Sequence, residues 1–277
     1  MPTKKLMTAN ALFQQIEVLK TNRNKRYRAG EFFIEGVRNI NEAVKNKWNI
    51  VSLCYTPSKP LSDWACDIID GVKTETNYEL TTVLMDRLSA KTSPSEIIAT
   101  AKMRDIDFSH IRSSKCPMIA LFDRPSNKGN LGSVIRSCDA FGVDGLIIIG
   151  HAVDLYDPEV IAASMGSFFS LPCIRITDNT SLFDYINKMR QQYPDFKTIG
   201  TTAHSQMVIY DVDLNCPTLI MTGNEAEGLS HSLKGNCDAL LRIPMSDKSS
   251  ASSLNAACAV TAVFSEAVRQ RRTITNK

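Results

Sequence analysis

An arginine stands in a segment rich in Gly and Asn, where a ligand could approach the backbone closely. The segment NKGNLGSVIRSCDAFGVDG begins at Asn127, and its arginine is Arg136. A guanidinium that points away from the core suits a phosphate or another anionic oxygen, although most arginines on helices are simply solvated. The residues that keep Arg136 off the core form an apolar stripe at helical spacing: Leu131, Val134, Ile135, Cys138 and Phe141.

Two further loops have a similar composition and also follow apolar runs. Residues 222–230 read TGNEAEGLS after TLIM, and residues 243–257 read IPMSDKSSASSLNAA after LLR. Gly allows close approach of the backbone, while Asn and Ser offer compact donors and acceptors. Ligands of parallel α/β sheets bind beyond the carboxyl ends of the strands. We therefore expect the three loops to form one site, with three ordinary turns as the alternative.

The elements that position these loops alternate between strand and helix patterns, which predicts an α/β domain with a parallel sheet over residues 116–277. Continuous apolar runs such as GLIIIG are typical of buried parallel strands. The predicted strands are 118–123, 145–150, 173–176, 197–202, 218–223 and 240–244, and the predicted helices are 131–141, 157–166, 181–192 and 252–272.

The first part of the chain shows a second alternation, which predicts a small α/β domain over residues 1–105. A polar stretch over residues 106–115 is interpreted as the linker between the two domains. The predicted helices of the first domain are 9–20, 37–46, 61–70 and 80–90, and its predicted strands are 31–36, 50–55 and 96–103.

Positive charge is concentrated near the start of the chain. Residues 1–50 hold ten Lys and Arg against four Glu, although the net charge of the whole chain is only +3. The densest stretch, KTNRNKRYRAG, is interpreted as a loop, and it combines cations with a tyrosine in a way that suits phosphates and a stacked base. A solvated basic surface is the alternative. The candidate RNA ligands are Arg23, Lys25, Arg26 and Arg28.

Composition excludes several classes of protein. The hydrophobic fraction of 43% and the charged fraction of 22% are ordinary for a globular protein. No apolar run is long enough for a transmembrane helix, and the first residues lack the pattern of a secretory signal, so we expect a cytoplasmic protein. The eight cysteines show no C-x-x-C spacing and have no nearby histidine cluster, which predicts reduced thiols and no metal site.

The three loops, taken in order, resemble the three motifs of the SpoU (TrmH-type) branch of the SPOUT methyltransferases. The segments concerned are NKGNLGSVIRSCDAFGVDG, GNEAEGLS and IPMSDKSSASSLNAACAVTAVFSEAVRQR. Within this branch, the likeness to ribosomal RNA methyltransferases extends over nearly the whole chain. The resemblance implies a ribose 2′-O-methyltransferase that uses S-adenosylmethionine, without a metal. It also implies a deep trefoil knot in the second domain, a homodimer, and a first domain that binds RNA, with rRNA as the expected substrate.

The resemblance also implies roles for individual residues. Arg136 would stabilise the developing alkoxide and clamp a phosphate, because a guanidinium stays protonated near neutral pH and is a poor base. Asn130 and Glu225 would hold the first loop and the arginine, while Ser253 and Asn255 would act at the start of the last helix. The cofactor would be bound mainly through backbone atoms, and the residues concerned are Gly223, Asn224, Ile243, Met245 and Leu254.

Three other functions remain open at this point. A Rossmann-type oxidoreductase would carry G-x-G-x-x-G after the first strand of a domain, and this motif is absent from the sequence. A non-catalytic RNA-binding or ribosome-assembly protein could keep the fold, but it would have no need for Asn130, Arg136, Glu225 and Asn255 together. A tRNA ribose methyltransferase would carry the same motifs, so a single sequence does not distinguish it from an rRNA enzyme.

Overall fold

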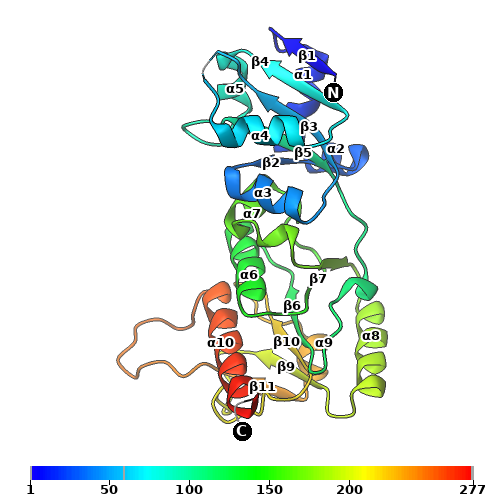
Figure 1. The fold of residues 1–277 in the computed structure, drawn as a ribbon. Helices are drawn as coiled ribbons and strands as arrows, with labels where there is room; N and C mark the ends of the chain where they lie inside the picture. The colour runs from blue at the N-terminus through cyan, green and yellow to red at the C-terminus, as the bar shows by residue number, and fades with distance from the viewer. Residues whose placement is uncertain (1, 59, 276–277) are drawn as a thin grey trace. The chain divides into compact units, whose positions relative to one another are not determined.

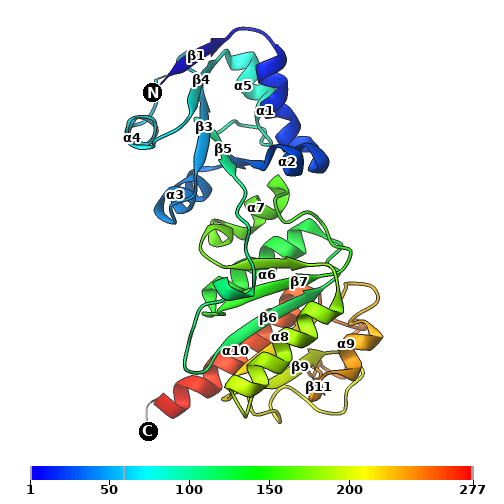
Figure 2. The ribbon, with the colours of Figure 1, turned by 90° about the vertical axis from the view of Figure 1, so that its right-hand side faces the viewer.

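The structure is a computed structural model that describes residues 2–58 and 60–275. The chain forms two compact units: residues 1–105 with 154–170, and residues 106–153 with 171–277. Figure 1 and Figure 2 show the ribbon from two sides. The segment 154–170, predicted to belong to the second domain, packs with the first unit. The division into an RNA-binding domain over residues 1–105 and a methyltransferase domain over residues 116–277 stays a prediction.

The first unit is built on a five-stranded mixed sheet in the order β1-β4-β3-β5-β2. β5 runs antiparallel to both β2 and β3, and the other pairs are parallel. Apolar side chains of α1 and α5 pack on one face, among them Phe13, Leu19 and Leu84. The elements are β1 Thr3–Leu6, α1 Ala11–Thr21, α2 Arg23–Ala29, β2 Glu31–Glu35, α3 Val37–Lys45, β3 Ile50–Tyr55, α4 Asp63–Gly71, β4 Thr76–Leu80, α5 Thr82–Leu88 and β5 Ile97–Lys102.

Two strands and one helix of this unit were missed from the sequence. β1 and β4 carry TKKL and TNYEL, which are too polar and too exposed to show an alternation. The stretch interpreted as a basic loop is the helix α2. The side chain of Asn22 caps its first turn by accepting from the Lys25 amide, and Gly30, with a φ of 63°, ends it.

The segment 154–170 joins the first unit through an aromatic cluster. Phe32 and Trp48 pack against Phe168, with ring centroids 5.8 Å and 5.4 Å away. The indole N–H of Trp48 donates to the carbonyl of Phe169 at 2.9 Å. Such burial of aromatic area, with the polar atom paired, is a strong stabilising contact. The segment contains α7 Pro158–Ser164 and the 3-10 turn η2 Ser167–Phe169.

The second unit contains a six-stranded sheet in the order β11-β9-β10-β6-β7-β8, and every pair is parallel. The predicted fold class is confirmed. Figure 1 shows α6 and α10 on one side of the sheet and α8 on the other. The elements are η1 Phe108–His110, β6 Met118–Asp123, α6 Lys128–Ala140, β7 Gly145–Ile149, β8 Cys173–Ile176, α8 Asn179–Gln192, β9 Lys197–Thr201, β10 Thr218–Thr222, α9 His231–Gly235, β11 Ala239–Leu241 and α10 Ala256–Thr275.

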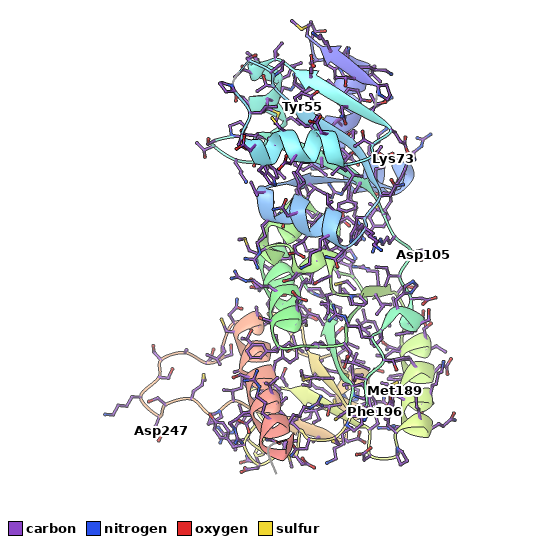
Figure 3. The ribbon with its side chains drawn as sticks, in the orientation of Figure 1. Tyr55, Lys73, Asp105, Met189, Phe196 and Asp247 are labelled. Atoms are coloured by element: carbon purple, nitrogen blue, oxygen red, sulfur yellow. The ribbon has the colours of Figure 1, made fainter. Side chains whose placement is uncertain are left out.

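The core of the second unit follows from the alternation of the strands. Side chains at every second position of β6, β7 and β10, such as Leu121 and Met221, point to the face covered by α8, where Tyr185 and Met189 meet them. Met189 and Phe196, which belong to this cluster, are labelled in Figure 3. On the opposite face α6 packs against α10, and the hydroxyls of Ser137 and Thr261 hydrogen-bond at 2.7 Å.

Candidate active site

The loops after β6, β10 and β11 come together at the carboxyl edge of the second sheet. β6 and β10 are direct neighbours, and β9 lies between β10 and β11. Because all of these strands are parallel, the loops that follow them lie at the same edge of the sheet. The sheet order therefore explains how segments as far apart in the sequence as Asn130 and Asn255 can contribute to one site.

Glu225 is the hub that joins the second loop to the first. Its carboxylate accepts from the amide and the hydroxyl of Ser126, at 3.0 and 2.6 Å, and from the amide of Asn127 at 3.2 Å. It also accepts from Asn130 Nδ2 at 3.0 Å. Partial burial raises the pKa of Glu225, but the hydrogen bonds from Ser126 and Asn130 outweigh it, so the pKa lies below its ordinary value. Glu225 is thus held as a carboxylate.

Asn130 carries the connection on to the third loop. Its Oδ1 accepts from Asn255 Nδ2 at 2.9 Å, while its Nδ2 donates to Glu225. Asn255 Oδ1 accepts from the amide of Ala257 at 2.9 Å and so caps the start of α10. The cap explains why α10 begins at Ala256, four residues later than predicted. One chain of side-chain hydrogen bonds, Glu225–Asn130–Asn255, therefore connects all three loops.

The second loop is a tight hairpin that leaves no room for a side chain at its start. Asn224 and Gly228 exchange backbone hydrogen bonds at 3.1 and 2.9 Å. A Cβ placed on Gly223 would lie 2.0 Å from the backbone of Gly228 and Leu229. Gly223 thus allows two backbone segments to pass in contact, and it leaves its own backbone open to the pocket beside it.

A pocket of about 560 Å³ lies beside the hairpin, within the size range of small-molecule sites. All five predicted cofactor residues line it, together with Glu225 and Ser253. Sequence reasoning missed another part of the wall, which includes Thr201, Thr202 and His204. Thr201 ends β9 and the other two follow it, so the same rule about carboxyl ends of strands would have found them.

The third loop is exposed along residues 246–255. Figure 1 shows it projecting away from α10, and Figure 3 labels Asp247 in its outer part. Hydrogen bonds among residues 246–251 form short turns within the loop, such as that from the Lys248 amide to Ser246 Oγ at 3.2 Å. Ser253 and Leu254 are exposed, and the residue that caps the last helix is Asn255 and not Ser253.

Arg136 lies on the exposed side of α6, off the buried stripe, as expected. It is not among the residues that line the pocket. Among the described residues we find no hydrogen bond or ion pair from its guanidinium. An exposed guanidinium with its donors uncommitted is available to a large anionic substrate. The structure thus brings Asn130, Glu225 and Asn255 into contact and leaves Arg136 outside that network.

The basic helix α2, in the first unit, contains one residue that cannot serve as predicted. Arg26 is 1% exposed. Its guanidinium donates to Asp154 Oδ2 at 2.6 and 2.8 Å and to the carbonyl of Leu19 at 2.8 Å, and it also pairs with Asp157 at 3.4 Å. The prediction that Arg26 contacts RNA is therefore wrong, because its donors are used inside the protein. Arg23, Lys25 and Arg28 are exposed.

Lys20 is also engaged within the first unit. Its ammonium donates to the carbonyls of Arg87, Leu88 and Ser89 at 3.2, 3.1 and 2.7 Å. These carbonyls lie at the end of α5, where a cation is favoured by the helix dipole. Arg23 lies over the ring of Tyr27, 5.6 Å from its centroid. The density of positive charge in the sequence did not distinguish the cations that are bonded within the unit, Lys20 and Arg26, from those that are exposed.

Comparison with known proteins decides the family. The model of the SpoU rRNA methylase family matches residues 117–265, and that of the SpoU L30e-like domain matches residues 10–99. The chain belongs to the SpoU rRNA methylase family. The 23S rRNA (uridine(2479)-2′-O)-methyltransferase of Streptomyces viridochromogenes is 41% identical over 268 residues, which cover 97% of this chain and 93% of that protein.

Solved structures of SpoU proteins agree with this assignment. The methyltransferase AviRb of Streptomyces viridochromogenes, in complex with AdoMet, matches with a TM-score of 0.90 at 42% identity, over 95% of this chain and 99% of that one. An AdoMet-bound rRNA methyltransferase of Sinorhizobium meliloti matches with a TM-score of 0.82 at 25% identity, over 96% of this chain and 98% of that one.

Within residues 2–58 and 60–275, no group of three or more His, Cys, Asp and Glu is arranged to hold a metal ion. No helix in the described part of the chain has the length and apolar character needed to cross a bilayer. All eight cysteines are free thiols.

Proposed function

We propose that the protein is an S-adenosylmethionine-dependent methyltransferase that modifies a ribose 2′-hydroxyl of large-subunit (23S) rRNA. The observation that carries this proposal is the convergence of three loops on one pocket, with Glu225, Asn130 and Asn255 linked by hydrogen bonds. Membership of the SpoU family supports it.

The pocket suits S-adenosylmethionine in size and in the character of its wall. Its volume is about 560 Å³, and Leu229, Ile243 and Leu254 supply apolar surface while Glu225 and the backbone at Gly223 supply polar groups. S-adenosylmethionine, when bound, supplies an electrophilic methyl group. We infer that Gly223, Asn224, Ile243, Met245 and Leu254 hold it, chiefly through backbone amides and carbonyls.

The protein's own residues divide the remaining work. Arg136 binds phosphate and stabilises the alkoxide that develops on the ribose, since its guanidinium is exposed and retains its charge. Glu225 fixes the first loop through Ser126, Asn127 and Asn130. Asn255 sets the start of α10 and ties it to Asn130. Ser253 lines the pocket beside Leu254, and we assign it a contact with the reacting groups.

The choice of RNA rests on the relatives. The relative at 41% identity acts on 23S rRNA, and a protein of Pseudomonas syringae named 23S rRNA (guanosine-2′-O-)-methyltransferase RlmB is 29% identical over 66% of this chain and 69% of its own. A tRNA ribose methyltransferase is the second candidate, because the motifs are shared between the two kinds of enzyme. An rRNA substrate also implies a cytoplasmic location.

Two measurements test the proposal. Isothermal titration with S-adenosylmethionine should show one site per chain, and Gly223→Ala should abolish binding, since its Cβ would lie 2.0 Å from backbone atoms. Transfer of labelled methyl groups to 23S rRNA and to tRNA, followed by primer-extension mapping, should place the label on a ribose of 23S rRNA. Label on tRNA alone would support the second candidate, and binding without transfer to either RNA would indicate a non-catalytic protein.

We further infer a homodimer and a trefoil knot, both implied by the family. Leu254 is 42% exposed at the third loop, and α10 carries small and apolar residues around much of its surface, more than one sheet face requires. A self-association surface there would cover them. Sedimentation at micromolar concentration should give the mass of two chains, and a single 30.7 kDa species would contradict the dimer.

A further inference from the structure

Arg124 lies at the first turn after β6 and has an unfavourable backbone conformation. Its φ is +51°, one of three positive values among the non-glycine residues of the described chain, and Pro125 follows it. A positive φ costs a non-glycine residue free energy, and the residue before a proline is normally extended. Gly150 accommodates the side chain, since a Cβ there would lie 2.9 Å from Arg124 Cγ. Surrounding contacts must therefore hold this conformation.

The backbone amide of Arg124 donates to the carbonyl of Ile149 at 2.9 Å, and its other polar contacts lead to the hairpin of the second loop or to its base. The guanidinium donates to the carbonyl of Gly228 at 3.1 Å and pairs with the carboxylate of Glu227. It also donates to both oxygens of Asp123, at 3.1 and 3.2 Å. In return, Asn224 Nδ2 donates to the carbonyl of Arg124 at 2.8 Å. Arg124 is thus hydrogen-bonded to both ends of the hairpin, at Asn224 and at Gly228.

Asp123 makes the same connection on the other side. Its carboxylate is 4% exposed, and it accepts from the amide of Ser230 at 2.8 Å as well as from Arg124. A buried carboxylate needs its partners, so removal of the Arg124 guanidinium would disturb the end of the hairpin as well as its tip. Arg124 itself does not line the pocket, whereas Asn224, Glu225 and Glu227 do.

We propose that Arg124 is a positioning residue that holds the 224–228 hairpin in the geometry that binds the cofactor. Glu225 fastens one side of the hairpin to residues 126–130, and Arg124 fastens the other side. The inference rests on the proposed function, because it concerns the same pocket. It adds a residue that precedes the segment beginning at Asn127 and that does not line the pocket.

Three substitutions separate the side chain from the backbone. Arg124→Gly relieves the positive φ but removes the guanidinium, Arg124→Ala removes it without relief, and Arg124→Lys keeps charge without the planar fork. We expect the Kd for S-adenosylmethionine to rise about tenfold in both Ala and Gly variants, and less in the Lys variant, since a bidentate contact is only partly replaced. The KM for the cofactor should rise by the same factor, while kcat at saturation should change less than about threefold, because a misplaced hairpin weakens binding before it alters Arg136.

A double-mutant cycle tests whether Glu227 acts through Arg124. Glu227 is 68% exposed, so Glu227→Ala should fold even if Arg124 variants do not. If the pair acts as one clamp, the Arg124→Ala/Glu227→Ala protein should bind only slightly more weakly than either single variant. Additive effects would mean that Glu227 contacts the ligand independently, and would overturn the clamp.

Controls distinguish failure of this inference from failure of the proposed function. Arg190→Ala removes an exposed arginine paired with Asp238 at 2.9 Å in the same unit, and it should leave cofactor affinity unchanged. Amide hydrogen exchange should be faster in peptides covering 224–228 for Arg124→Ala and unchanged for Arg190→Ala. If the wild-type protein binds no S-adenosylmethionine, the proposed function is contradicted. If Arg124→Ala and Glu227→Ala bind it as tightly as the wild type does, the positioning role alone is contradicted.

Discussion

Helices α2 and α6 each carry an arginine that the sequence predicts to bind RNA. The two arginines differ in burial and in pairing. Arg26 of α2 is 1% exposed and paired with Asp154 and Asp157. Arg136 of α6 is exposed, and its charge is uncommitted among the described residues. The difference teaches that an arginine's role depends on which carboxylates the fold brings to it. A buried pair anchors an element, whereas an exposed cation is available to a substrate.

The largest effect should come from breaking the buried pair. Arg26→Ala leaves two buried carboxylates without their cation, and breaking such a pair costs about 3–5 kcal/mol. We expect the free energy of unfolding, measured by urea denaturation, to fall by about that amount in Arg26→Ala. Arg28→Ala, an exposed position on the same helix, should stay within about 0.5 kcal/mol of wild type. Equal stability of the two variants would remove the contrast between the buried and exposed positions.

The exposed arginine should show the reverse behaviour. Arg136→Ala should lower the rate of methyl transfer by about 10²–10³, as for loss of one electrostatic stabiliser, and change stability by less than about 0.5 kcal/mol. Affinity for S-adenosylmethionine, measured by titration, should be that of wild type. Lys188→Ala, which removes an exposed cation of α8, serves as the control for rate. A variant that keeps more than about a tenth of the activity would show that Arg136 is not the principal stabiliser.

The first turn of α6 offers a sharper test, because the side chain of Asn130 is hydrogen-bonded to both Glu225 and Asn255. Asn130→Asp replaces the donor to Glu225 with a second carboxylate, and two such groups in contact do not both ionise easily. We expect a loss of activity of about tenfold or more at a pH of about 8. The introduced carboxyl group and Glu225 would titrate as a coupled pair, with a pKa raised above that of Glu225 in the wild type, which lies below its ordinary value.

The sign of the pH dependence follows from the opposite directions of the two pKa shifts, since the pKa is lowered in wild type and raised in Asn130→Asp. In wild type, the lowered pKa of Glu225 means that the carboxylate stabilises the loops above the ordinary pKa, and that this is lost only as the pH falls through the lowered value. In Asn130→Asp, protonation restores one donor, so relative activity should improve as the pH falls from about 8 toward about 6. A pH profile for Asn130→Asp parallel to that of wild type would exclude contact between the two carboxylates.

The smallest effect should come from the outward face of α2. The variant with Arg23, Lys25 and Arg28 changed to Ala loses up to three phosphate contacts while the Arg26 anchor is kept. The slope of log affinity against log salt for single-stranded RNA should flatten by up to about 2, at roughly 0.7 per contact. Cofactor affinity should not change. An unaltered slope would mean that α2 is a solvated surface. Of the two helices, only α6 would then contact RNA, through Arg136.

Much of the second unit could be predicted because its signals are local. Continuous apolar runs gave β6, β7 and β10 within a residue of their ends, and the rule that parallel strands carry sites at their carboxyl ends led to the three loops. β1 and β4 were missed, since TKKL and TNYEL are partly exposed and carry too few apolar residues to show a period. The wall at residues 201–204 was missed because the short polar run at the end of β9 resembled an ordinary turn.

The sequence by itself determined the class of the protein: the three motifs, their order and the alternation of strands and helices all depend on residues close together in the chain. Only the tertiary structure decided which polar groups are used up inside it. Arg26 and Asp154 are 128 positions apart, and Asn130 and Asn255 are 125 apart. Hydrogen bonds and burial depend on distance in space, and no local pattern carries that distance, so the anchor at Arg26, the contacts of Arg124 with the hairpin and the bond between Asn130 and Asn255 became visible only once the chain was folded.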